Sequence, residues 1–103
     1  MLEVKGPGRA ELVEQLAALI ASFERRGRAP DRWESFCLVR ALDNLSIGYL
    51  SEVNRQIGLA GLPAELRPPD GFRRIPQTYE PMTAEAMRGA LEAVSDRPKI
   101  LHA

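Results

Sequence analysis

The sequence has little of the chemistry that most metal sites use. Its 103 residues include one cysteine, Cys37, and one histidine, His102. A zinc site normally draws on several cysteine or histidine ligands at short spacing, so no metal site is predicted. A single cysteine also excludes an intramolecular disulfide, which fits a reducing compartment. We expect Cys37 to be a small core residue, because a reactive thiolate needs an exposed cationic setting.

Long apolar runs and net charge are missing as well. No apolar run approaches the roughly 18 residues that cross a bilayer, and the first residues lack the basic and apolar regions of a secretory signal. We therefore expect a cytoplasmic protein that does not bind membranes. Fourteen basic side chains balance fourteen acidic ones, so the overall charge does not favour nucleic acid or anionic lipid. Twelve of the cations are arginine, which is typical of a GC-rich bacterial genome.

Recognisable catalytic motifs are also absent. The chain contains neither a Gly-x-x-x-x-Gly-Lys phosphate loop nor a Gly-x-Gly-x-x-Gly fingerprint, and it lacks the Glu-x-x-His pattern of di-iron bundles. Two carboxylate pairs, Glu11 with Glu14 and Glu85 with Glu92, fall on the predicted polar sides of their helices, where solvation explains them. We predict no catalytic residue and no cofactor. An enzyme with an unrecognised site stays as an alternative.

Helical periodicity is what the sequence has in abundance. Apolar residues recur at spacings of three and four in three segments, and residues suited to helix ends flank them. Gly27 is suited to end the first helix, Asp31 and Glu34 form a capping-box pair that begins the second, and Thr83 is suited to cap the third. We predict an all-α fold, a small bundle whose main helices cover about 10–26, 31–57 and 84–95.

The second segment determines the predicted architecture. A continuous helix over 31–57 would be about 40 Å long at about 1.5 Å per residue, whereas a domain of this size has a radius of gyration of about 13 Å. Such a helix would extend beyond the single domain predicted over 1–103, so we expect dimerisation, or another protein, to complete the bundle. Gly48 offers the alternative of a break, because glycine inside a helix costs about 1 kcal/mol relative to alanine.

Proline dominates the stretch between the second and third segments. Residues 62–81 hold five of the eight prolines, which excludes a long helix there. The apolar side chains among them predict an ordered loop over the helices, with a short helical turn at Ala64-Glu65-Leu66. We expect the second segment and this loop to supply the partner-binding side chains, namely Leu38, Leu42, Leu45, Tyr49, Val53, Phe72, Ile75, Tyr79 and Met82.

One stretch resembles a known DNA-binding motif. Residues 40–45 followed by 50–59 look like the first two helices of a winged helix-turn-helix domain, in which a recognition helix comes next. Here the prolines after residue 62 permit about one helical turn in its place. The resemblance implies a DNA-binding regulator, in which the phosphate-contacting candidates would be Arg25, Arg26, Arg28, Arg32, Arg67, Arg73 and Arg74.

The function predicted from these observations is non-catalytic protein binding through helices. The apolar surplus on 31–57, the neutral charge and the lack of a catalytic set fit an accessory subunit, an antitoxin or immunity-type protein, or a small regulator. We expect a homodimer, another protein partner, or both. The DNA-binding regulator is the alternative from a different class.

Overall fold

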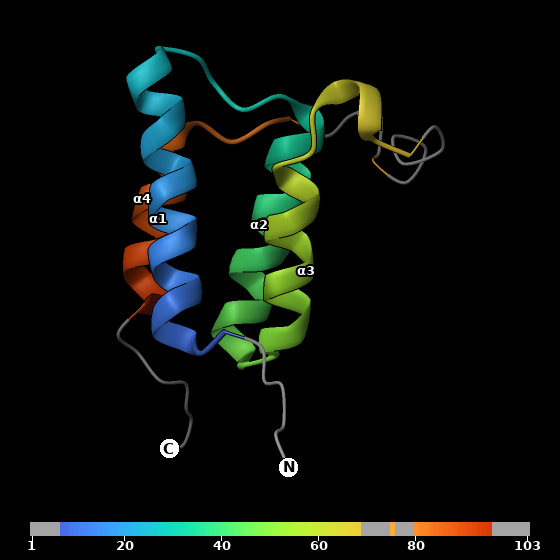
Figure 1. Ribbon diagram of the computed structural model, residues 1–103. Helices are drawn as coiled ribbons and strands as arrows, with labels where there is room; N and C mark the ends of the chain where they lie inside the picture. Colours follow the sequence, from blue (N-terminus) through green and yellow to red (C-terminus); the bar gives the residue numbers. More distant parts are fainter. Residues whose placement is uncertain (1–6, 69–74, 76–79, 96–103) are drawn as a thin grey trace.

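The computed structural model describes residues 7–68, 75 and 80–95 of the chain (Figure 1). Over these residues the chain forms helices and no strand, which confirms the all-α prediction. The elements are α1 (Arg9–Arg26), α2 (Arg32–Ile47), α3 (Leu50–Ala60), the short 3₁₀ helix η1 (Ala64–Leu66) and α4 (Ala84–Ser95).

The ends of these helices follow local side-chain chemistry. Gly27 ends α1 in the left-handed region, at φ 65°. At the start of α2, the Glu34 backbone N–H donates to Asp31 Oδ1 at 2.8 Å, and the Asp31 N–H donates to Glu34 Oε1 at 2.9 Å. At the start of α4, the Ala86 N–H donates to Thr83 Oγ1 at 3.0 Å. The three predicted boundaries are confirmed.

The prediction of one helix over 31–57 is wrong, because Gly48 divides that segment. α2 ends at Ile47, and α3 begins at Leu50. Gly48 lies at φ 82°, where an L side chain is disfavoured, and its N–H donates to the Leu45 carbonyl at 3.1 Å. The chain reverses at this residue. In the part of the chain that the structure describes, four α-helices therefore replace the three predicted main helices, and α2 and α3 do not form the long helix whose overhang motivated a homodimer.

Replacing Gly48 with alanine tests this turn by the sign of its effect. A Cβ at Gly48 meets no atom within 4 Å, so only the left-handed φ opposes it. We expect Gly48→Ala to lower the free energy of unfolding by about 1–2 kcal/mol, whereas in a continuous helix it would raise it by about 1 kcal/mol. Gly58→Ala, inside α3 and equally unobstructed, is the control and should stabilise. Urea denaturation measures both changes.

The helices α2 and α3 form an antiparallel hairpin (Figure 1). At the open end of this hairpin, Trp33 Nε1 at the start of α2 donates to the Leu59 carbonyl near the end of α3 at 2.7 Å. α1 packs against α3 and α4, and α2 packs against α3 and α4, so the main contacts run around a ring of four helices.

The core lies inside this ring and draws on every α-helix. Apolar side chains on one stripe of each helix face the centre, as amphipathic helices in a bundle require. The buried apolar residues are Leu12, Leu16, Ile20, Phe23, Trp33, Cys37, Leu38, Ala41, Leu42, Leu45, Val53, Ala60, Ile75, Met87 and Leu91.

The first turn of α2 holds the connection between α3 and α4. Arg32 Nη2 donates to the Ile75 carbonyl at 3.2 Å, and the Met82 N–H donates to the buried Ser35 Oγ at 2.8 Å. The short turn predicted at 64–66 is confirmed as η1. The prediction of an ordered loop over all of 62–81 stays a prediction, because much of it lies outside the described residues.

An ion-pair cluster closes the same end of the bundle. Glu34 Oε1 lies 3.1 Å from Arg28 Nη1, and Glu34 Oε2 lies 3.8 Å from Arg67 Nη2. Arg67 Nη1 also pairs with Asp31 at 3.1 Å, and its guanidinium lies over the Trp33 ring, 5.7 Å from the centroid. The Arg67 and Glu34 side chains are only 9% and 11% exposed. This end of the bundle therefore combines two nearly buried opposite charges, Arg67 and Glu34, with two more exposed ones, Arg28 and Asp31.

Candidate binding surface

The turn between α2 and α3 exposes two large apolar side chains. Ile47 is 71% exposed and Tyr49 is 56% exposed, on either side of Gly48. The backbone there is fixed by the Gly48 bond described above and by a bond from the Tyr49 N–H to the Asn44 carbonyl at 2.9 Å. We call Ile47, Tyr49 and the neighbouring Leu50 the apolar corner. Ile47 and Tyr49 are thus displayed beside a turn that is already hydrogen-bonded, while Leu50 packs partly against the core.

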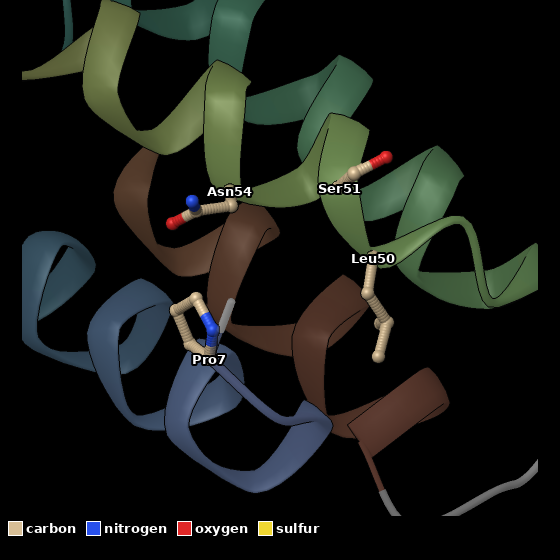
Figure 2. Close-up of a pocket in the computed structure, with 4 residues that line it drawn as sticks. All are labelled: Pro7, Leu50, Ser51 and Asn54. Atoms are coloured by element: carbon tan, nitrogen blue, oxygen red, sulfur yellow. The ribbon is translucent and has the colours of Figure 1, made fainter. Parts of the chain in front are cut away.

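A cleft adjoins the apolar corner. It has a volume of about 220 Å³ and is lined by Pro7, Leu50, Ser51 and Asn54. Figure 2 shows Pro7, beside the start of α1, opposite Leu50 and Asn54 on α3, while the Ser51 hydroxyl points away from Pro7. None of the four lining residues carries a charge. Leu50 therefore belongs both to the corner and to the wall of the cleft.

Arg9 holds the helices around this end of the bundle in place. Its Nη1 donates to the Leu45 carbonyl at 2.8 Å, and its Nη2 donates to the Val94 carbonyl at 2.6 Å. These carbonyls belong to the last turns of α2 and α4, where a cation is favoured by the negative end of the helix dipole. One guanidinium thus fixes the start of α1, next to Pro7, relative to the end of α2, next to Ile47.

Most of the predicted partner-binding residues do not lie on this surface. Leu38, Leu42, Leu45 and Val53 are buried in the core of the bundle, because α2 and α3 are separate helices whose apolar stripes both face its centre. Of the predicted residues in the second segment, Tyr49, in the turn between α2 and α3, is the exposed one.

The loop members of that set divide in the same way. Ile75 is buried, and Met82 packs partly buried against the core. Phe72 and Tyr79 lie outside the described residues. Sequence reasoning missed Ile47, Asn54 and the role of Leu50. The available signal was Gly48 itself, since a break there leaves the apolar residues beside it on a turn.

The arginines proposed for phosphate contact are partly engaged within the chain. Arg28 and Arg67 pair with carboxylates in the cluster described above, and Arg32 donates to a backbone carbonyl. Arg25 and Arg26 are exposed at the end of α1. The other two candidates, Arg73 and Arg74, lie outside the described residues. The five of these arginines that the structure describes therefore do not form one free basic surface.

The hairpin geometry also departs from the DNA-binding motif. The two helices of a helix-turn-helix cross at a steep angle and a recognition helix is presented to the groove, whereas α2 and α3 run antiparallel and pack along each other. η1, which follows α3, is three residues long. The resemblance noted for 40–45 and 50–59 does not extend to the described structure.

Cys37 is buried and carries a neutral thiol. Burial, the largest effect, raises the pKa of Cys37 from about 9 to about 11 because the core disfavours the thiolate, although Arg67 and Arg40 act in the opposite direction. The described part of the chain contains no group of three or more residues suited to hold a metal ion. No described helix is long and apolar enough to cross a membrane.

The raised pKa of Cys37 predicts a pH effect with a definite sign. The folded state holds the thiol proton more tightly than the unfolded state, so the stabilisation is fully present below about pH 9 and is lost as pH rises toward 11. We expect the urea midpoint of the wild type to fall over this window more steeply than that of Cys37→Ala. Plots of urea midpoint against pH that run parallel for the two proteins would show that the Cys37 thiol is not shielded from water.

Comparison with protein-family models, with curated proteins and with solved structures returned no significant match. The function is therefore argued from the surface itself.

Proposed function

We propose that this chain is a non-catalytic protein-binding module that acts through the apolar corner and the adjacent cleft. The observation that carries the proposal is the exposure of Ile47 and Tyr49 on both sides of the Gly48 turn. An accessory subunit, an antitoxin or immunity-type protein, and a small regulator are the kinds of protein that we consider. A cytoplasmic location fits the single buried thiol.

Preorganisation supports this corner as a binding surface. The backbone of the corner is restrained before any partner binds, by the hydrogen bonds at Gly48 and Tyr49 and by the bond from Arg9 to the Leu45 carbonyl. The chain would therefore lose little conformational freedom there on binding. Tyrosine suits such a position because its ring gives apolar contact area and its hydroxyl can bond at the wet rim.

A homodimer is not the arrangement we favour. The continuous helix that would have extended beyond the domain is replaced by a hairpin, and its apolar stripe lies in the core. A stable dimer commonly buries about 800 Å² per partner. Two exposed side chains beside a small cleft fit a narrower contact better, such as a short segment of another protein.

Site-specific cross-linking tests the proposal. A photoreactive phenylalanine placed at Tyr49, in cells of the native host, should yield a discrete adduct with another protein. The same group at Leu66, which is 64% exposed at the other end of the bundle, should not. Adding Ile47→Asp should abolish the adduct at position 49. Equal adducts at both positions, an adduct of two copies of this chain, or no adduct would overturn the proposal.

A further inference from the structure

The main helix pairings of the bundle each join a helix before Gly48 to a helix after it. α1 and α2 both pack against α3 and α4, and these four pairings are the main contacts between the described helices. Two hydrogen bonds cross the same boundary, since Trp33 donates to the Leu59 carbonyl and Ser35 accepts from the Met82 N–H. The chain thus consists of two halves, α1–α2 and α3–α4, packed on each other and joined by the turn at one end of the bundle (Figure 1).

The buried face of α2 continues in phase into α3, although the turn separates the two helices. Positions that alternate between three and four residues apart lie on one face of a straight α-helix. Tyr49, in the turn, occupies the position that joins the two parts of the series, and it is the exposed member. The series has spacings of four, three, four, four, three and four residues, and it consists of Leu38, Leu42, Leu45, Tyr49, Val53, Gln56 and Ala60.

Gly48 opposes a continuous helix within this otherwise helical pattern. Glycine adopts the left-handed conformation without strain and is a weak helix former, so it favours the turn on both counts. A Cβ at Gly48 would meet no atom within 4 Å, so the preference comes from the backbone and not from packing. One residue therefore biases the segment 32–60 toward a hairpin, while the buried positions on either side also fit a single helix.

We propose that the chain has a second folded state, a domain-swapped dimer in which 32–60 forms one helix in each copy. The α1–α2 half of one copy packs against the α3–α4 half of the other, so the main helix pairings are kept and the turn is lost. Short hinge loops favour such an exchange. The hairpin stays the prevailing form at low concentration, because the two halves of one chain are already linked.

The swapped dimer goes beyond the proposed function, and its existence does not depend on it. It differs from a homodimer formed through the apolar corner, because the two copies exchange core helices instead of covering an exposed patch. In the swapped state Tyr49 lies in the middle of a long helix, and the turn that displays it beside Ile47 no longer exists. Dimerisation would therefore withdraw the apolar corner from other proteins, and only this consequence rests on the proposed function.

Refolding at two protein concentrations tests the swap. The chain is unfolded in urea and refolded at about 10 µM and at about 1 mM, the order of the effective concentration that a short linker gives, and light scattering measures its mass. We expect monomer at the lower concentration and a dimer fraction at the higher one. Gly48→Ala disfavours the turn and favours the helix in both copies, so it should raise the association constant about a thousandfold.

Two control variants isolate the effect of the turn. Gly58→Ala makes the same substitution at a residue that is helical in both states, so it should leave the dimer fraction unchanged. Three glycines inserted between Gly48 and Tyr49 lengthen the hinge and interrupt a long helix, so this variant should stay monomeric at both concentrations. Dimer should therefore increase in Gly48→Ala and decrease in the insertion variant.

Pulsed electron spin resonance distinguishes a swapped dimer from a surface dimer. Spin labels at Ala29→Cys and Gly61→Cys, in a Cys37→Ala background, flank the bond from Trp33 to the Leu59 carbonyl. Labelled chains are refolded with an excess of unlabelled chains, so that only distances within one chain are measured. This distance should be short in the monomer and about 40 Å or more in the swapped dimer, at about 1.5 Å per helical residue.

Three outcomes would overturn the inference. They are a short distance within the labelled chain of the dimer, equal dimer fractions in Gly48→Ala and Gly58→Ala, and monomer alone in both the wild type at the higher concentration and Gly48→Ala. The wild type carries this test even where Gly48→Ala fails to fold. A cross-link from position 49 to another protein would be unaffected by any of them, so the failure of the swap leaves the proposed function standing.

Discussion

Leu45→Ala is expected to lower the free energy of unfolding by about 3 kcal/mol, a large part of the stability of a domain of this size. Leu45 is fully buried near the end of α2, and its carbonyl receives the Arg9 guanidinium. Truncation removes apolar contacts and leaves a cavity that the surrounding helices fill only in part. Urea denaturation followed by circular dichroism gives the change.

The same variant decides between two roles for the α2 stripe. If Leu45 were an exposed contact for a partner, truncation would change the stability of the free chain by less than about 0.5 kcal/mol. Leu66→Ala, which shortens an exposed leucine, provides that reference value. Equal urea midpoints for the two variants would contradict the four-helix packing.

Glu34→Ala is expected to cost about 3 kcal/mol, because the nearly buried Arg67 guanidinium loses one of its carboxylate partners and the start of α2 loses a capping bond. The variant loses the pair with Arg28, the pair with Arg67 and the bond that Glu34 accepts from the Asp31 N–H. Among the described residues, the Arg67 side chain, 9% exposed, then keeps Asp31 as its carboxylate partner.

Two further variants separate charge from helix capping. Glu34→Gln can still accept the bond from the Asp31 N–H but lacks the charge. Its free energy of unfolding should therefore fall between that of the wild type and that of Glu34→Ala. Arg88→Ala breaks the exposed pair between Arg88 and Glu24 and should change stability little. A loss for Arg88→Ala as large as that for Glu34→Ala would show that the cluster has no special role.

The helix boundaries could be predicted from sequence wherever a side chain acts on its own neighbourhood. Three local signals mark helix ends, namely the Asp31–Glu34 pair, Thr83 and Gly27. The first two cap the helices that follow them, and Gly27 ends α1 in the left-handed region. Gly48 could not be decided in the same way. Glycine inside a helix costs only about 1 kcal/mol relative to alanine, so local propensity does not decide between a continuous helix and a break. The deciding contribution is the packing of α3 back along α2.

The candidate surface was harder to predict than the fold. Amphipathic spacing identifies a stripe but cannot tell whether the chain or a partner covers it, and here the chain itself buries the stripe that includes Leu38 and Leu42 in the core of the bundle. The cleft joins Pro7 to α3 across more than forty residues of chain, so no local pattern indicates it. Tyr49 was identified for its apolar spacing but is exposed because it follows a break.

The two-residue link between α2 and α3 has a consequence for the order in which the bundle assembles. Closing a short loop costs less entropy than closing a long one, and contacts close in sequence form faster. The α2–α3 hairpin, joined by Gly48 and Tyr49, should therefore form first during folding. The pairing of α1 with α4, the helices farthest apart in sequence, should come later. The apolar corner would then be in place before the bundle closes.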